Sequence, residues 1–429
     1  MGDGIARAVG IDIGTSGVRA AAVDSTGTML ADHGVRFPDG AREDPAAWRR
    51  AVEAVLTGLA AALALSEVTA VTVDGTSGTL LALDGAGTPI GPASMYHAVC
   101  DDAAVHAAVH KQAPLDSSAR GASSPLARAI VLARRQGVQR VVHQADWVAG
   151  LLCGRFDTTD CNNALKTGGD AEALIWPSWL GRAGMDTTFL PAIVEPGRRI
   201  AFVRLEAVAL GLPRSAAVHA GTTDGCASFL ATGADQPGDA VTALGSTLVL
   251  KMLSNVPINA ARYGIYSHRI GQRYLVGGAS NSGGEVLIAL FGAERLSKLS
   301  AMVRPNHPTG LDYYPLLRPG ERFPFSDPAL PPRLHPRPDD ESLFFQGVLE
   351  GIAEIERQGY ARLASLGAPT LRSVRSVGGG AANAGWTALR QQRFSAPFLK
   401  SRSEAACVGA AVLGLSASQT AETDAGTMR

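Results

Sequence analysis

The same short pattern occurs twice in this sequence: an apolar strand, a turn of glycine and small hydroxyl residues, and a second apolar strand. The first copy occupies residues 8–23 and reads AVGIDIGTSGVRAAAV, and the second occupies residues 241–253 and reads VTALGSTLVLKML. A pattern that returns in the second half of a chain indicates a repeated architecture. The length of 429 residues also exceeds what one hydrophobic core usually serves. The sequence therefore predicts two related lobes.

The residues around the first copy predict a mixed α/β lobe. Residues 8–37 alternate short apolar runs with turn residues, which is typical of a three-stranded antiparallel meander. Asp44 and Pro45 provide a cap and a first-turn proline, and apolar residues then recur at helical spacing up to Leu63. An apolar run that reads as a buried strand, VTAVTVDG, follows at residues 68–75. We therefore expect a sheet covered by an amphipathic helix.

The organisation of the remaining chain is less regular. We divide it into an N-terminal lobe of residues 1–216 and a C-terminal lobe of residues 217–429. Residues 304–338 are rich in proline and lack a period, so we expect a long surface excursion there. Apolar spacing predicts a long amphipathic helix at residues 341–366. The small and polar residues from about 416 onward are expected to fray.

Charge and composition exclude several classes of function. Lysine plus arginine and aspartate plus glutamate both total 39, so no net charge steers the protein toward nucleic acid or an anionic membrane. We expect a small-molecule substrate instead. The five cysteines are scattered and form no C-x-x-C pair, which fits a reducing compartment. Without a signal-peptide pattern or an apolar run of membrane-spanning length, we expect a cytoplasmic protein, either a monomer or a homodimer.

The turn in the first copy carries the strongest chemical signal. Asp12 ends the first strand, and the small residues that follow place backbone N–H groups and hydroxyls where a terminal phosphate would bind. The same carboxylate can hold a magnesium ion through water. The alternative is a hairpin turn capped by Asp12. The second copy offers the same donors, and two such turns facing across a cleft would grip a polyphosphate. The candidate phosphate ligands are Thr15, Ser16, Gly245, Ser246 and Thr247.

A third glycine cluster has the features of a nucleotide-base site. Gly379, Gly380 and Asn383 lie between a strand-like run and a helical segment, and glycines there let a flat base approach the backbone. The alternative is a tight strand-to-helix turn. The sequence does not support a P-loop or a dinucleotide-binding fold, because the chain has neither G-x-x-x-x-G-K-[ST] nor a G-x-G-x-x-G after its first strand. The chain also lacks the H-E-x-x-H and G-x-S-x-G motifs, so a metalloprotease or a serine hydrolase is less favoured.

Asp224 is the candidate general base. It lies in AGTTDGCA, between a strand-like run and the first apolar turn of a helix. A carboxylate on such a turn can project into a cleft and take a proton from a substrate hydroxyl. Asp is also a favoured helix N-cap, so capping is the alternative role.

Taken together, these segments resemble the FGGY carbohydrate kinases, a branch of the actin-like ATPase superfamily. The likeness spans nearly the whole chain and keeps the family's order. It implies an α/β, two-lobe actin-like (ribonuclease H-like) fold that binds sugar in the N-terminal lobe and nucleotide in the C-terminal lobe, with ATP and Mg2+ as cofactors. The matching segments are GIDIGTSGVRAAAVD, AGTTDGCAS, ALGSTLVL, GERFPFSDP, LEGIA, GGGAANAGW and EAACVGAA.

The resemblance also implies roles for single residues. Asp12 would position magnesium and Asp224 would be the general base, while the two hydroxyl-rich turns would contact phosphates. The adenine and ribose side would be formed by Gly379, Gly380 and Asn383.

The loop expected to contact the sugar sets the choice of substrate. Residues 74–79 read DGTSGT where bacterial xylulose kinases carry a Gln-Met-His-Gly type loop, and they resemble the cyanobacterial and plant xylulose-kinase-like group associated with D-ribulose. Residues 98–102 depart from that group's acidic and arginine positions. Ser77 has an alternative role, that of closing its own turn. The candidate sugar contacts are Asp12, Asp74, Ser77 and Asp224.

We therefore expect an ATP-dependent kinase that converts a small ketose, with D-ribulose favoured, to its phosphate. The alternatives are a kinase for D-xylulose or another polyol, an actin-like ATPase that moves a partner, and a catalytically silent sugar sensor.

Overall fold

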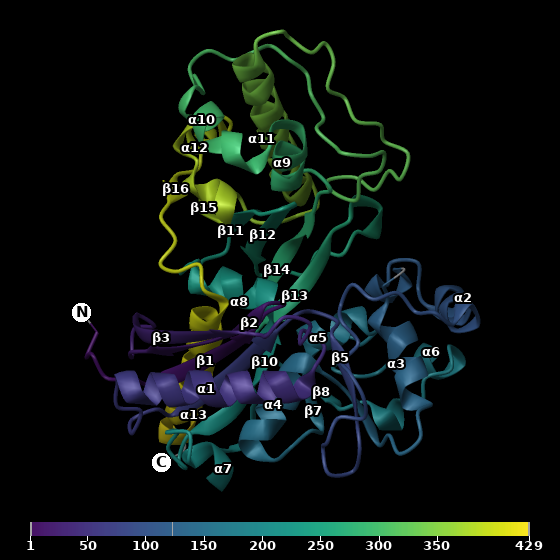
Figure 1. Cartoon of the computed structure of the whole chain (residues 1–429), viewed down its shortest axis with the longest axis vertical. Coiled ribbons are helices and arrows are strands. Elements are labelled where there is room, and N and C mark those ends of the chain that lie inside the picture. Colours follow the sequence, from purple (N-terminus) through teal and green to yellow (C-terminus); the bar gives the residue numbers. More distant parts are fainter. Residues whose placement is uncertain (1, 122, 428–429) are drawn as a thin grey trace. The chain divides into compact units, whose positions relative to one another are not determined.

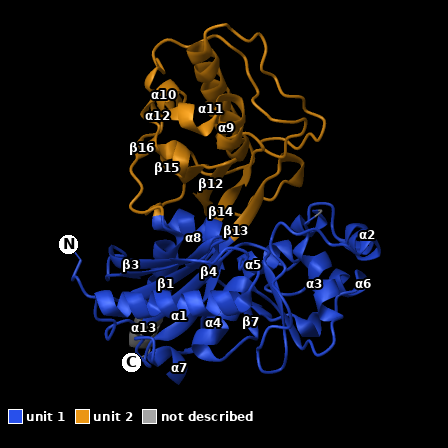
Figure 2. Ribbon diagram, in the orientation of Figure 1, with its two compact units in different colours: residues 1–231, 269–271, 405–429 blue, residues 232–268, 272–404 orange. Residues whose placement is uncertain are grey.

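The computed structural model describes residues 2–121 and 123–427, with side chains described no further than Gln419. The chain forms two compact units, each assembled from separate stretches of sequence (Figure 2). Unit 1 contains residues 1–231, 269–271 and 405–429, and unit 2 contains residues 232–268 and 272–404.

Unit 1 is built on a six-stranded mixed sheet (Figure 1). Its first three strands pair antiparallel, which is the meander predicted for residues 8–37. The next two strands across the sheet run parallel to the first. The order across the sheet is β3 (Met29–Arg36), β2 (Gly17–Val23), β1 (Ala8–Ile13), β4 (Ala70–Gly75), β10 (Ala217–Thr223) and β9 (Arg199–Phe202).

The predicted amphipathic helix covers one face of this sheet. Helix α1 (Pro45–Ala62) begins with the side chain of Asp44 accepting a hydrogen bond from the N–H of Ala46, the cap that the Asp-Pro pair predicted. Its buried stripe includes Trp48, which packs in one apolar core with Val9 of β1. Burial of this stripe supplies most of the helix's stability, as is usual for helices in proteins.

The other face is covered by the end of the chain. In helix α13 (Ala406–Thr427), Cys407 and Ala411 pack against Ala8 of β1, which points away from α1 because neighbouring strand residues face opposite sides. The helix continues to Thr427, and the expected fraying from about residue 416 stays a prediction. The helix here is consistent with the composition, because alanine has the highest intrinsic helix propensity.

The division of the chain also differs from the predicted boundary at residue 216. Strand β10 and the following helix α8 (Asp224–Ala231) lie beyond that boundary but belong to unit 1. The reason is pairing, because β10 is hydrogen-bonded between β4 and β9. Residues 405–429 return to unit 1 for the same kind of reason, the burial of α13 on the sheet.

A smaller helical region extends unit 1 between β4 and β9 in the sequence. It has its own apolar core and two short two-stranded sheets. Its elements are β5 (Leu80–Leu83), α2 (Ala103–Gln112), α3 (Pro125–Ala133), β6 (Arg140–His143), α4 (Gln144–Cys153), β7 (Thr158–Asp160), α5 (Cys161–Lys166), α6 (Trp179–Arg182) and β8 (Ala192–Val194). Helix α7 (Leu205–Val208) lies between β9 and β10 and packs in the core under the main sheet.

Unit 2 repeats the start of unit 1. Strands β11 and β12 form an antiparallel hairpin and β15 runs parallel to β11, as β4 runs parallel to β1. The sheet order is β13 (Tyr266–Ile270), β14 (Arg273–Ala279), β12 (Leu248–Ser254), β11 (Asp239–Leu244), β15 (Ser373–Val377) and β16 (Phe398–Leu399). The helices are α9 (Gly284–Phe291), α10 (Leu296–Ala301), α11 (Glu341–Ser365) and α12 (Ala384–Gln391).

Helix α11 matches the amphipathic helix predicted at residues 341–366, and it buries Phe344, Val348 and Ile352 in the core of unit 2. Residues 304–338 contain neither helix nor strand, as expected for an excursion. Among the described residues, no helix combines the length and apolar character needed to cross a membrane.

Close packing between α13 and α8 yields a stability prediction. A Cβ atom on Gly409 of α13 would lie 1.7 Å from the carbonyl oxygen of Ala227 in α8, so Gly409→Ala must push the helices apart. We expect a loss of about 1–3 kcal/mol in the free energy of unfolding, measured by denaturant titration. Gly181 in α6 has open space around the same position, so Gly181→Ala should be neutral or slightly stabilising. Equal effects of the two substitutions would contradict this packing.

Candidate active site

Three acidic side chains meet at one edge of the unit 1 sheet. Strands β1, β4 and β10 are neighbours and run parallel, with Asp12 opposite Asp74 and Asp74 opposite Thr222 in the register. Asp224 follows β10 directly and opens α8. The carboxyl ends of parallel strands are where ligands bind in open α/β sheets. The structure thus brings together Asp12, Asp74 and Asp224, which are far apart in the sequence.

The first two carboxyls interact strongly. Burial raises the pKa of Asp12 to about 6, and the nearby Asp224 carboxylate raises it as well. Asp74 is completely buried, and burial, followed by the charges of Asp12 and Asp224, raises its pKa well above the usual range. Among the described residues, no donor reaches either oxygen of Asp74. The pair is stabilised when Asp74 is protonated and its hydroxyl donates a hydrogen bond to Asp12. This arrangement avoids a buried charge on Asp74 and removes the repulsion between the two carboxylates. Asp12 is then the ionised member of the pair.

The turn between β1 and β2 is compact and its tip is accessible. The N–H of Gly14 donates to the carbonyl of Gly17 at 3.0 Å, and the carbonyl of Ser16 accepts from the N–H of Phe37 at 3.0 Å. Thr15 is half-buried and Ser16 is exposed.

The turn between β11 and β12 in unit 2 has the same exposure pattern, with Gly245 and Thr247 half-buried and Ser246 exposed. Each unit therefore presents one hydroxyl-bearing hairpin turn to its surroundings.

The third glycine cluster forms a short turn that leads into α12. The side-chain oxygen of Asn383 accepts a hydrogen bond from the N–H of Trp386 at 2.9 Å, and its amide nitrogen donates to the hydroxyl of Ser300 at 2.8 Å. Asn383 is therefore a helix cap, and its amide group is already engaged. Around Gly379, a Cβ atom would meet nothing within 4 Å, so the space beside this glycine is open, whereas Gly380 is packed against Trp386.

The loop expected to contact sugar is held by residues that sequence reasoning missed. The carboxamide oxygen of Gln144 accepts from the N–H of Thr76 at 3.0 Å and from its hydroxyl at 2.8 Å. Arg128, whose pKa burial lowers to about 10, donates to the carbonyl of Gly78 at 2.7 Å. Within the described part of the chain, the buried hydroxyl of Ser77 has no hydrogen-bond partner. This hydroxyl does not close its own turn, contrary to the alternative considered for it.

A second missed residue supports the strand that leads to Asp224. The side chain of Asn162 is fully buried and donates to the hydroxyl of Thr222 at 3.0 Å. It also pairs with the backbone of Arg269, donating to its carbonyl and accepting from its N–H, both at 2.8 Å. Asp160 accepts in turn from the N–H of Asn162. The only signal in the sequence is the Asp-x-Asn pattern of a helix cap, which says nothing of partners 60 or more residues away.

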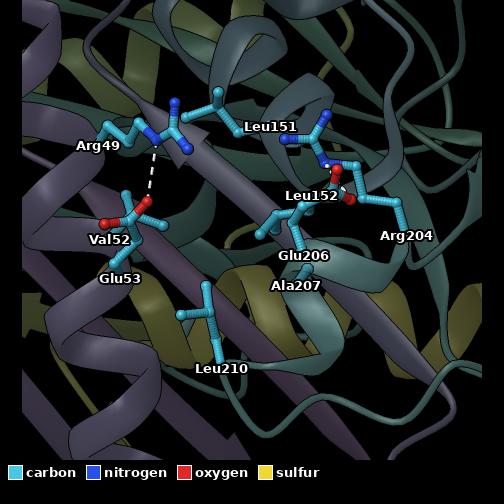
Figure 3. Close-up of a pocket in the computed structure, with 9 residues that line it drawn as sticks. All are labelled: Arg49, Val52, Glu53, Leu151, Leu152, Arg204, Glu206, Ala207 and Leu210. Carbon is cyan, nitrogen blue, oxygen red and sulfur yellow. Dashed lines mark hydrogen bonds and ion pairs between the residues drawn. The ribbon is translucent and has the colours of Figure 1, made fainter.

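Unit 1 also has a small pocket lined by other residues (Figure 3). Its wall includes two ion pairs, Arg49 with Glu53 and Arg204 with Glu206, above an apolar floor. With a volume of about 30 Å³, it holds only a few water molecules. None of the candidate site residues lines it.

Comparison with known proteins identifies relatives for each part of this architecture. Residues 240–418 match the C-terminal domain of the FGGY family of carbohydrate kinases. A xylulose kinase of Streptomyces rubiginosus is 29% identical over 257 residues, which cover 56% of this chain and 52% of that enzyme. The chain therefore spans about half the length of the curated relatives it matches.

Solved structures match nearly the whole chain. The crystal structure of xylulose kinase from Rhodospirillum rubrum superposes with a TM-score of 0.80 at 24% identity, covering 95% of this chain and 88% of that one. A Plasmodium falciparum glycerol kinase crystallised with ADP gives a TM-score of 0.80 at 15% identity, covering 96% and 89%. These likenesses establish the two-domain actin-like (ribonuclease H-like) fold.

The buried carboxyl of Asp160 predicts a pH dependence of stability. Burial, followed by the charge of Asp146, raises its pKa from the ordinary 3.8 to about 7. Between these two values the folded state holds a proton that the unfolded state has lost, so stability falls as the pH rises from 4 to 7. The fall is at most about 4 kcal/mol at ~1.36 kcal/mol per pKa unit.

Denaturation of wild type and Asp160→Asn between pH 4.5 and 8 tests this, because the variant should lose the slope. Asp186→Asn is the control: hydrogen bonds to Thr188 lower the pKa of Asp186, so its contribution is constant in this range. Parallel profiles for wild type and Asp160→Asn would contradict the assignment.

Proposed function

We propose that this chain is an ATP-dependent sugar kinase, because residues 240–418 match the C-terminal domain of the FGGY family of carbohydrate kinases. The observation that carries this proposal is the meeting of Asp12, Asp74 and Asp224 at the carboxyl edge of β1, β4 and β10. Phosphoryl transfer to a hydroxyl needs a base for the proton and a carboxylate near the metal. These three side chains supply both from one edge of one sheet.

Asp224 suits the role of general base better than its two neighbours. Asp74 is completely buried, and its raised pKa favours the protonated form, which cannot accept another proton. Asp224 is half-buried and lies in the first turn of α8, where the helix dipole favours an ionised carboxylate. One of its oxygens accepts from the N–H of Gly225 at 2.6 Å, which fixes the orientation of the carboxylate. The ionised carboxylate would accept the proton of the sugar hydroxyl as the hydroxyl oxygen bonds to the terminal phosphorus of ATP. The bond between that phosphorus and the bridging oxygen breaks in the same step, and ADP leaves.

Asp12 suits a magnesium site. Mg2+ usually binds proteins through one or two carboxylates and completes its shell with phosphate oxygens and water. Asp12 is half-buried and is the ionised member of its pair. A bound magnesium ion would neutralise charge on the phosphates of ATP. Asp12 would hold it through water, and Asp74 would keep the Asp12 carboxylate in place.

The remaining proposed contacts to the nucleotide are those that the resemblance implies. In each unit the exposed hairpin turn would contact phosphates. The open space beside Gly379 suits a flat base, and Asn383 would act there through its cap on α12 rather than through a free amide. The proposed contacts are Thr15, Ser16, Gly245, Ser246, Thr247, Gly379, Gly380 and Asn383.

The proposed substrate is a small ketose, with D-ribulose favoured. The support is the DGTSGT loop, in which the buried hydroxyl of Ser77 is left for a ligand, together with Asp12, Asp74 and Asp224 as the other sugar contacts. D-xylulose is the second candidate, because the curated relatives are xylulose kinases.

Asp224→Asn tests the general base. An amide keeps the shape of the carboxylate but cannot accept a proton, so turnover should fall by about 10²–10⁴-fold, the usual contribution of a general base. ADP release would be measured with D-ribulose and with D-xylulose, and binding of an ATP analogue should be nearly unchanged. Asp44→Asn, which alters the cap of α1, is the control and should leave turnover intact. Turnover of Asp224→Asn within a few-fold of wild type rules the assignment out.

Ser77→Ala tests the choice of sugar. D-ribulose and D-xylulose differ in the orientation of one hydroxyl, and a buried polar group left unpaired by one of them costs about 1–3 kcal/mol, or roughly ten- to a hundred-fold in kcat/KM. We expect wild type to favour D-ribulose by this factor and Ser77→Ala to lose most of it. Ser25→Ala, in an exposed turn, should keep the wild-type ratio. An unchanged ratio in Ser77→Ala removes Ser77 from the site, and a wild-type preference for D-xylulose overturns the choice of ribulose.

A further inference from the structure

The irregular excursion of unit 2 contains a buried carboxylate. Glu321, in the GERFPFSDP segment, is only 3% exposed. One of its oxygens accepts from the hydroxyls of Ser280 at 2.6 Å and Tyr314 at 2.9 Å. The other accepts from the N–H groups of Asn281 at 2.8 Å, Arg322 at 2.8 Å and Phe323 at 3.4 Å. A buried carboxylate is tolerated only with such a complete set of donors. Glu321 therefore fixes the positions of the segments that carry these donors.

Two of the donors belong to the connection between β14 and α9. Within this connection the hydroxyl of Ser280 accepts from the N–H of Ser282 at 3.0 Å. The connection is also joined to the first residue of β12 on both sides: the N–H of Ser280 donates to the carbonyl of Leu248 at 2.9 Å, and the N–H of Leu248 donates to the carbonyl of Ser282 at 2.8 Å. Leu248 follows directly on the exposed hairpin turn at residues 245–247.

The start of α9 forms hydrogen bonds with that hairpin turn itself. The N–H of Gly284 donates to the carbonyl of Gly245 at 2.9 Å, and the N–H of Glu285 donates to the carbonyl of Ser246 at 3.0 Å. The approach requires glycine, because a Cβ atom on Gly284 would lie 2.7 Å from the carbonyl oxygen of Gly245. Two successive carbonyls of the turn are therefore directed at α9.

These two hydrogen bonds determine where the N–H groups of the turn point. In a trans peptide the C=O and N–H bonds of one plane point in opposite directions. With the carbonyls of Gly245 and Ser246 held by α9, the N–H groups of Ser246 and Thr247 point away from it. Two adjacent N–H groups with a common direction are the usual way in which backbone binds an anion.

We propose that Glu321 is a positioning residue for the phosphates of the nucleotide. It acts through the connection at residues 280–283 and the first two residues of α9, which fix the turn at residues 245–247 with its N–H groups directed outward. The proposal rests on the proposed function, because a nucleotide polyphosphate is the anion concerned. It also explains a motif of the sequence, GERFPFSDP, to which no other part of the site gives a role.

The simpler alternative is that Glu321 only fastens the excursion to unit 2. Tyr313→Phe separates the two roles. The hydroxyl of Tyr313 donates to the carbonyl of Pro336, so its loss loosens the same excursion without touching residues 280–285. Ser280→Ala makes the opposite change, because it keeps Glu321 and removes one of its links to the turn.

The experiment compares Glu321→Gln, Ser280→Ala and Tyr313→Phe in the full chain. Amide hydrogen exchange of residues 245–248 is measured without ligand, and MgADP binding is measured by calorimetry. We expect Glu321→Gln and Ser280→Ala to accelerate exchange in the turn and to weaken MgADP binding by roughly 10- to 100-fold, as loss of buried hydrogen bonds does. The KM for ATP should rise while the KM for the ketose stays constant. Tyr313→Phe should change the unfolding midpoint alone.

The outcomes also separate this inference from the proposed function. Wild-type exchange and MgADP affinity in both Glu321→Gln and Ser280→Ala would overturn the inference, as would a Tyr313→Phe variant that matches them. If Glu321→Gln does not fold, Ser280→Ala alone decides. Faster exchange in these variants, with no MgADP binding even by wild type, supports the control of the turn by Glu321 but refutes the kinase assignment.

Discussion

The parallel register of β1, β4 and β10 is the constraint on which the candidate site depends. It places two aspartates opposite each other within a buried sheet edge, where like charges repel and water is excluded. Such an arrangement is unfavourable by itself and persists only because the surrounding packing holds it. That packing comes from α1 on one face and α13 on the other. The apolar cores of unit 1 thus maintain an acidic cluster that the strands would not form alone.

Much of this arrangement was accessible from the sequence because it depends on local patterns. The meander, the Asp44-capped helix and the long helix α11 follow from spacing and capping within a few residues. Asp12 and Asp224 stand out because each follows an apolar strand in a run of small residues. The strand-to-helix turn considered for the third glycine cluster is also local, and in the structure Asn383 caps the helix that follows it.

What the sequence did not reveal depends on distant partners. The hydrogen bond between Gln144 and Thr76 joins residues 68 positions apart, and that between Asn162 and Thr222 joins residues 60 positions apart. No periodic pattern in the sequence encodes such pairings. The unit boundary failed for the same reason, since β10 joins strands that lie far before it in the chain. The hairpin turns show the limit most clearly. They look alike in sequence, but different segments hydrogen-bond to them. Phe37 donates to a carbonyl of the first turn, and the start of α9 donates to two carbonyls of the second.

The return of α13 to unit 1 has a consequence for the order in which the protein is made. The apolar face formed by Ala8, Ala21 and Ala70 is complete once β4 has been synthesised, yet its cover is the last helix of the chain. Ala231 of α8 joins this face earlier, but α13 is missing until the ribosome has added more than 300 further residues. Contacts of such long sequence separation slow folding and leave apolar surface available for aggregation. The first lobe therefore completes this face only after the second lobe has been synthesised.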